Sequence, residues 1–186
     1  MGEKRRMVLG HVTIDETSRI KLLDGLKFDP TKAVNIGCGR DYIKGWVNVD
    51  GDPIISPDIV CELDSKNVRL PFEDNSMDLV YACHILEHIH YLPELKREFV
   101  RILKPGGAIF VVVPHYLSAD AWGDDTHCRG FSYHSFYANF WPGTQKEFKF
   151  MELYIPGDPR AGSAQTFSVY EKGELLWLSA LRYKNE

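Results

Sequence analysis

Short apolar segments alternate with turn residues through the middle of the chain. Five of them, at residues 33–37, 46–50, 59–63, 77–83 and 108–113, are apolar almost throughout rather than at every second position. Strands buried on both faces have this pattern, and such strands are typical of parallel sheets covered by helices. The pattern therefore predicts an α/β fold.

Residues 92–103 carry the clearest helical pattern, with apolar positions close to a 3.6-residue period. Pro93 stands in the first turn, where its missing N–H is not needed, and Pro105 ends the helix. Two weaker segments precede the strands: residues 7–14 could form a strand and residues 18–26 a short helix.

The last third of the chain follows a different pattern. We expect a helix at 132–140, an alternating strand at 147–154 and a loop at 157–162. Residues 175–183 could form either an edge strand or a helix. Short strands here are compatible with an antiparallel hairpin that closes a parallel sheet.

Composition is that of one globular domain: 186 residues, 44% hydrophobic and 26% charged. The net charge of −4 argues against a protein that grips nucleic acid or an anionic membrane through charge. The longest apolar run, 108–113, is far shorter than the ~20 residues of a membrane span. No secretory apolar region follows the charged N-terminal residues, so we expect a cytoplasmic chain.

Four cysteines are present, and no two are spaced as Cys-x-x-Cys. Disulfide frameworks belong mainly to shorter secreted chains. We expect free and mostly buried thiols at Cys38, Cys61, Cys83 and Cys128.

Glycine and aspartate mark a candidate ligand site. The first strand runs directly into Gly37-x-Gly39, and the second ends at Asp50. Ligands of open α/β sheets bind at the carboxyl ends of strands, where a carboxylate can accept bonds from a ribose diol. A third glycine is absent because Tyr42 holds its place, which disfavours a dinucleotide. The alternatives are a tight turn for the glycines and a helix N-cap for Asp50 before Pro53.

The connection from Gly39 to Asp50 is also short. Only ten residues lie between them, whereas a βαβ crossover usually takes a dozen or more. We therefore expect the helix between the first two strands to be cut to about one turn.

Four motifs in sequence order resemble the small type 11 group of class I S-adenosylmethionine-dependent methyltransferases. They are Asn35-Ile-Gly-Cys-Gly-Arg40 with Gly45-Trp-Val-Asn-Val-Asp50, Leu70-Pro-Phe-Glu-Asp-Asn-Ser-Met-Asp-Leu-Val80, His84-Ile-Leu-Glu-His-Ile89 and Leu103-Lys-Pro-Gly-Gly107. The resemblance covers residues 33–114 closely and the remainder more weakly.

The resemblance implies a single domain over residues 1–186. Residues 33–114 would form its cofactor-binding core, and 115–186 its substrate side and closing part. The implied fold is a Rossmann-like three-layer sandwich, with a mostly parallel seven-stranded sheet, an antiparallel last strand and a shortened first helix.

The resemblance also implies S-adenosyl-L-methionine as cofactor and S-adenosyl-L-homocysteine as product. The loop 37–39 would pass under the methionine part, Asp50 would hold the ribose, and 62–64 would flank the adenine, with either acid contacting it. The implied cofactor residues are Asn35, Gly37, Cys38, Gly39, Asp50, Gly51, Glu62, Leu63, Asp64, Cys83 and His84.

Methyl transfer from a sulfonium needs mainly orientation, and a general base where the acceptor is weakly acidic. His127 with Asp125 as its orienting carboxylate is one candidate base, and His84 and His115 are others. Asp125-Thr-His127 resembles an Asp-Pro-Thr-His segment of some family members. Alternatively, Asp125 and His127 brace the 132–140 helix. The expected acceptor is a small molecule or sugar-like metabolite. Aromatic residues are dense between 116 and 141, where they could belong to the core or line the pocket; in the second case a planar or sugar-like acceptor would suit them.

Two other functions stay open. His84-x-x-Glu87-His88, with His90 nearby, matches the inverted zinc-protease pattern and would suit a zinc hydrolase. It follows a buried strand rather than lying within a long helix, so we assign no metal. The second alternative is a non-catalytic or partner-dependent methyltransferase-like subunit, which the retained Gly37, Gly39 and Asp50 disfavour.

Overall fold

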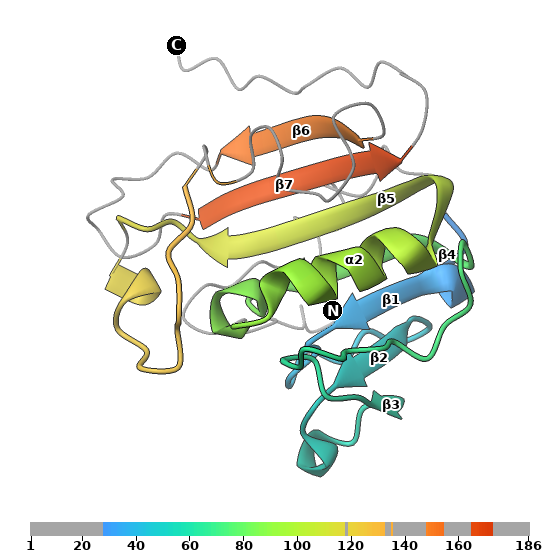
Figure 1. Ribbon diagram of the computed structural model, residues 1–186, viewed down its shortest axis with the longest axis horizontal. Helices are drawn as coiled ribbons and strands as arrows, with labels where there is room; N and C mark the ends of the chain where they lie inside the picture. The colour runs from blue at the N-terminus through green and yellow to red at the C-terminus, as the bar shows by residue number, and fades with distance from the viewer. Residues whose placement is uncertain (1–27, 118, 133–134, 136–147, 155–164, 173–186) are drawn as a thin grey trace, which may run out of the picture.

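A seven-stranded sheet forms the centre of the molecule, in the order β3-β2-β1-β4-β5-β7-β6 (Figure 1). The computed structural model describes residues 28–117, 119–132, 135, 148–154 and 165–172. Five strands are parallel: β1 (Ala33–Ile36), β2 (Val47–Asp50), β3 (Ile59–Val60), β4 (Met77–Cys83) and β5 (Leu103–Pro114). This parallel part confirms the predicted α/β, Rossmann-like fold.

Two strands lie beyond β5. β7 (Gln165–Lys172) pairs antiparallel with β5, and β6 (Phe148–Tyr154) pairs antiparallel with β7. The strand predicted at 147–154 is β6, whereas β7 was not predicted. Its sequence alternates Phe167 and Val169 with polar residues, which is the pattern of a short strand.

One long helix, α2 (Leu92–Ile102), lies along one face of the sheet (Figure 1). It has Pro93 in its first turn and ends one residue before the predicted end. Its apolar side, including Leu95 and Phe99, is fully buried against inward residues of β1, β4 and β5. The periodicity therefore identified both the helix and the face that packs.

The opposite face of β4 and β5 carries aromatic residues at the described positions. Side chains alternate along a strand, so Tyr81 and Phe110 point away from the cluster packed on α2. Tyr81 and Phe110 stack with ring centroids 5.3 Å apart. Trp46 meets Tyr81 edge-on at 5.7 Å, and Phe28 meets Trp46 at 5.5 Å. A row of rings thus covers this face from β5 towards β2.

The connection between β1 and β2 contains turns and no helix over residues 37–46. The single helical turn that was predicted here is therefore absent as well. Buried Asn48 holds this connection instead, because its side chain accepts from the Ile43 N–H and donates to the carbonyls of Ile43 and Trp46.

Several predicted boundaries differ in the structure. β3 spans only 59–60, and the chain leaves the sheet after the Cys61 N–H has donated to the Asp50 carbonyl at 2.8 Å. β5 begins at Leu103 and runs through the predicted turn at 105–107, where its register with β4 shifts. The predictions for 7–14, 18–26, 157–162, 175–183 and nearly all of 132–140 lie outside the described residues. Within the described part, no helix has the length and apolar character needed to cross a bilayer.

Candidate functional site

The glycine loop after β1 is fitted closely to the segment that follows β4. Gly37 has φ +66°, and a Cβ there would lie 2.5 Å from Cγ1 of Ile85. The N–H groups of Gly37 and Cys38 both donate to the Val49 carbonyl, at 2.8 and 3.1 Å. Gly39 also has a positive φ, of +51°, but no atom lies within 4 Å of its Cβ position. The loop is therefore tied to the sheet at Gly37 and open at Gly39.

Asp50 closes this loop at the end of β2. Its Oδ2 accepts from the Gly39 N–H at 2.8 Å, and its Oδ1 accepts from the Asp52 N–H at 2.9 Å. An ionised carboxylate has about four acceptor positions, so two are left for a ligand. The alternative role of Asp50 as an N-cap is not observed, because Asp52 caps the short helix Pro53–Ile55. This arrangement fits a ribose diol.

The two acids after β3 have different surroundings. Oδ1 of Asp64 accepts from the Tyr91 N–H at 2.9 Å, and Oδ2 lies 2.8 Å from Nδ1 of His90. Burial would raise the pKa of Asp64, but these hydrogen bonds outweigh it and lower the pKa. Glu62 is exposed, while the Leu63 side chain lies in the core. Asp64 thus holds the start of α2, whereas the exposed Glu62 has one backbone contact, in which its Oε1 accepts from the Asp64 N–H at 3.0 Å.

Three further residues that were expected at the cofactor have buried side chains. The buried Asn35 amide donates to the Asp41 carbonyl at 2.9 Å and to Oδ1 of Asn48 at 3.1 Å. Burial, with Asp50 nearby, raises the pKa of the Cys38 thiol to about 11, so it is protonated near neutral pH. Cys83 is buried as well. These buried side chains are part of the packing under the candidate ligand site.

The cysteines are free, and their burial follows the prediction only in part. Cys38 and Cys83 are buried and Cys61 is half-buried, whereas Cys128 is exposed. Cys128 lies on the loop after β5 rather than in a strand, which explains the difference.

His84 occupies a strained position directly after β4. Its φ is +53°, a left-handed conformation that non-glycine residues rarely adopt. Its N–H donates to the Val112 carbonyl at 2.9 Å, and its Nδ1 lies 3.1 Å from Oε1 of Glu87. Residues held in this way are found disproportionately at functional sites.

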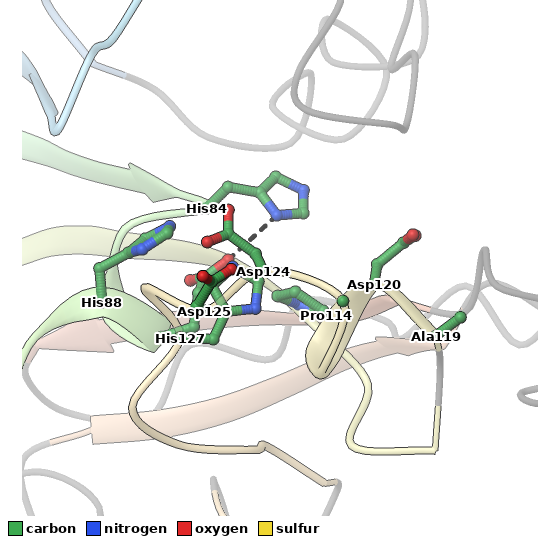
Figure 2. Close-up of a pocket in the computed structure, with 10 residues that line it drawn as sticks. His84, His88, Pro114, Ala119, Asp120, Asp124, Asp125 and His127 are labelled. Carbon is green, nitrogen blue, oxygen red and sulfur yellow. Dashed lines mark hydrogen bonds and ion pairs between the residues drawn. The ribbon is translucent and has the colours of Figure 1, made fainter.

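A cavity of about 520 Å³ opens beside His84 (Figure 2). It lies between the end of β4 and the loop that follows β5, and it brings together the three residues predicted for catalysis. Its lining residues are His84, Glu87, His88, Pro114, Ala119, Asp120, Gly123, Asp124, Asp125 and His127. His115 is not among them; burial lowers its pKa.

The predicted Asp125–His127 pair is not among the contacts of the described residues. Nδ1 of His127 instead lies 3.1 Å from the Ala121 carbonyl. The reason is local: Asp124 accepts from the N–H and the hydroxyl of Thr126, at 2.8 and 2.6 Å, and this turn sets the direction of the chain. Sequence reasoning missed Asp124 and Thr126, although Asp-x-Thr is a known turn signal.

The zinc-protease geometry is also absent over 84–90, which the structure describes throughout. Residues Leu86–His88 form one 3-10 turn rather than an α-helix. His84 has a positive φ and pairs with Glu87, so His84 and His88 do not share a helical face.

A family model described as a methyltransferase domain matches residues 34–111. This match covers less than half of the chain and takes in the glycine loop, Asp50 and α2. Sequence matches to curated proteins are partial. The chain is 28% identical over 111 residues to the biotin biosynthesis bifunctional protein BioHC of Cellvibrio japonicus, covering 49% of this chain and 22% of that protein. It is 42% identical over 43 residues to the sterol 4-C-methyltransferase strm-1 of Caenorhabditis elegans, covering 23% and 13%. The matches thus span less than a quarter of these relatives.

Solved structures share the fold of the methyltransferase domain at low identity. A putative methyltransferase in complex with the Haloferax volcanii activator Trm112 is 18% identical, with a TM-score of 0.60 over 84% of this chain and 89% of that one. A Burkholderia thailandensis 1,6-didemethyltoxoflavin-N1-methyltransferase, which holds S-adenosylhomocysteine, is 14% identical, with a TM-score of 0.56 over 85% and 76%. An S-adenosylmethionine-dependent methyltransferase from Archaeoglobus fulgidus is 16% identical, with a TM-score of 0.57 over 83% of this chain and 92% of that one.

Proposed function

We propose that this chain is a cytoplasmic methyltransferase that transfers a methyl group from S-adenosyl-L-methionine to a small-molecule or sugar-like acceptor. One observation carries the proposal: the Asp50 carboxylate, held by two backbone N–H groups, keeps acceptor positions beside the open Gly39. In this proposal β7 and β6 complete the seven-stranded sheet of the class, within one domain.

The cofactor would lie along the carboxyl ends of β1, β2 and β4. The backbone of 37–39 would face its methionine part, Asp50 its ribose and Glu62 its adenine. When bound, the cofactor supplies a methyl group that its sulfonium charge already activates.

The acceptor would enter the cavity beside His84, since about 520 Å³ is a usual volume for a small-molecule site. Nδ1 of His84 donates to the Glu87 carboxylate in this arrangement, which makes Nε2 the acceptor atom of the ring. His84 would thus remove the acceptor's proton, with Glu87 in the orienting role expected of Asp125. Asp125 and His127 would contact the acceptor from the facing loop.

Calorimetric titration with S-adenosylhomocysteine tests the proposal. Wild type should bind close to one equivalent. Gly39→Ala should weaken binding by at least about tenfold, because its methyl group enters the space beside Asp50. Gly45→Ala is the matched control: Gly45 also has a positive φ, of +88°, and open space around it, so the substitution adds similar strain. No binding by folded wild type, or equal binding by both variants, would contradict the proposal.

A second candidate is a methyltransferase-like subunit that needs a partner. It is favoured by the complex of a structurally similar chain with the activator Trm112. This candidate requires folded wild type to bind S-adenosylhomocysteine weakly or not at all when it is alone. If the isolated chain binds S-adenosylhomocysteine saturably, cofactor binding needs no partner, and this candidate is wrong on that point.

A further inference from the structure

Three metal-ligating side chains come together among the residues that line the cavity. Glu87, His88 and His127 each offer a ligand atom, and these atoms lie within 4.8 Å of one another. Glu87 and His88 come from the turn after β4, and His127 comes from the loop after β5. The His88 and His127 rings are 4.6 Å apart between centroids. The cluster therefore depends on the folded chain and not on a single motif.

Glu87 supplies a buried carboxylate oxygen that has no partner. The residue is 1% exposed. Its Oε1 pairs with Nδ1 of His84, whereas its Oε2 has no hydrogen bond within the described part of the chain. A buried carboxyl oxygen is costly unless a cation or a hydrogen-bond donor satisfies it. Oε2 thus lacks the positive partner that a metal ion would provide.

Both histidines are held so that the other ring nitrogen can bind a metal. Thr126 donates its one hydroxyl proton to Asp124 at 2.6 Å, so its oxygen accepts from Nδ1 of His88 at 2.9 Å. Nδ1 of His127 donates to the Ala121 carbonyl at 3.1 Å. Each ring then carries its lone pair on Nε2. Metal-ligating histidines usually donate their second N–H to such groups.

We propose that Glu87, His88 and His127 bind one divalent transition-metal ion of the zinc class. Two imidazoles and one carboxylate suit zinc, iron, cobalt or nickel better than magnesium or calcium, which prefer oxygen ligands alone. Three protein ligands leave positions open towards the cavity. Binding of the metal ion does not depend on the proposed methyl transfer. A role of the ion in holding an oxygen or nitrogen atom of the acceptor, in contrast, rests on the proposed function. His84, a ligand in the zinc-hydrolase reading, is not one here.

Titration of the chelator-treated full chain with Zn²⁺ tests the site, with Co²⁺ and its visible absorption as a second probe. Wild type should bind one equivalent. Glu87→Gln and His127→Ala should each lower the affinity by at least about 100-fold, because loss of a supporting partner alone usually costs 10- to 100-fold. His127 lies on a partly exposed loop, so its removal should leave the fold intact, which circular dichroism checks.

Two matched controls locate the ion. His90→Ala removes an exposed imidazole that pairs with Asp64, and Cys128→Ser removes a thiol whose sulfur lies 3.2 Å from the Glu87 carbonyl. Both should bind Zn²⁺ like wild type. Binding lost in either control, or kept in folded His127→Ala, overturns the assignment, as does failure of folded wild type to bind.

The support of His88 gives a further check. Thr126→Val removes the oxygen that accepts from Nδ1 of His88 and should weaken Zn²⁺ binding about 10- to 100-fold, whereas Thr126→Ser keeps the oxygen and should bind as wild type does. A separate titration with S-adenosylhomocysteine distinguishes the two proposals, because cofactor binding should persist in Thr126→Val. Equal Zn²⁺ affinity in both Thr126 variants would overturn the arrangement.

Discussion

Replacing Asp50 by asparagine tests the ribose contact at nearly constant shape. The native carboxylate accepts from the N–H groups of Gly39 and Asp52, one on each oxygen. A carboxamide has only one acceptor oxygen, so its NH₂ must face one of these donors or turn to the ligand. The change therefore removes the charge and also frees one end of the glycine loop.

The size of the effect follows from the strength of charged hydrogen bonds. A hydrogen bond to a charged group contributes about 1.5–3 kcal/mol. Loss of one such bond to the ribose corresponds to about 10- to 150-fold weaker binding. Asp50→Asn should therefore raise the Kd for S-adenosylhomocysteine by about this factor, measured by calorimetry at constant pH and salt.

Asp52→Asn is the control, because it removes the same charge two residues away. Asparagine and aspartate are about equally good helix N-caps, and Asp52 acts as an N-cap here. Its affinity should stay within about twofold of wild type, the usual range for surface substitutions. If folded Asp50→Asn binds as tightly as Asp52→Asn, the assignment of Asp50 to the ribose is wrong.

Two predictions concern stability. Arg101 donates to the Leu70 and Phe72 carbonyls and pairs with nearly buried Glu98, so Arg101→Ala should lower the free energy of unfolding by about 3–5 kcal/mol in urea titrations; a loss below 1 kcal/mol would contradict this. Burial lowers the pKa of Lys96 to about 8. Between about pH 8 and 10.5 the unfolded chain then binds a proton that the folded chain lacks, so stability should rise with pH, and Lys96→Met should lack that rise. An unchanged pH slope in Lys96→Met would show that another group causes it.

The strands that the sequence identified well are those buried on both faces. β1 and the core of β4 are apolar nearly throughout, and α2 has a continuous apolar side, so each pattern had one interpretation. β3 is shorter than its apolar run because it lies at the sheet edge. The missing helix between β1 and β2 is replaced by hydrogen bonds of Asn48, which no periodicity reveals.

The candidate site also has a part that the sequence predicts and a part that it does not. Gly37, Gly39 and Asp50 follow neighbouring parallel strands, so topology alone brings them to one edge. The sequence left open which of Glu62 and Asp64 would contact the adenine. In the structure the two acids differ because Asp64 is held by His90 and the Tyr91 N–H at the start of α2, and these contacts cannot be predicted from the sequence.

Partners on the acceptor side could not be predicted from spacing. The loop after β5 returns to the end of β4, where the Cys128 N–H donates to the Glu87 carbonyl across 41 positions of sequence. This return brings His127 to Glu87 and His88. Asp125 and His127 are two positions apart, and the turn that Asp124 forms with Thr126 directs Nδ1 of His127 to the Ala121 carbonyl instead.

The position of β1 in the sheet has a consequence for synthesis of the chain. β1 is buried between β2 and β4, and it pairs in parallel with both. A nascent chain that has released β1 and β2 must still produce residues 51–76 and then β4 before the second edge of β1 is paired. Non-local parallel pairing of this kind closes slowly, because chain entropy is lost before the contacts form. During that interval the apolar β1 edge is open to other chains, so the yield of folded protein should depend on how quickly translation delivers β4.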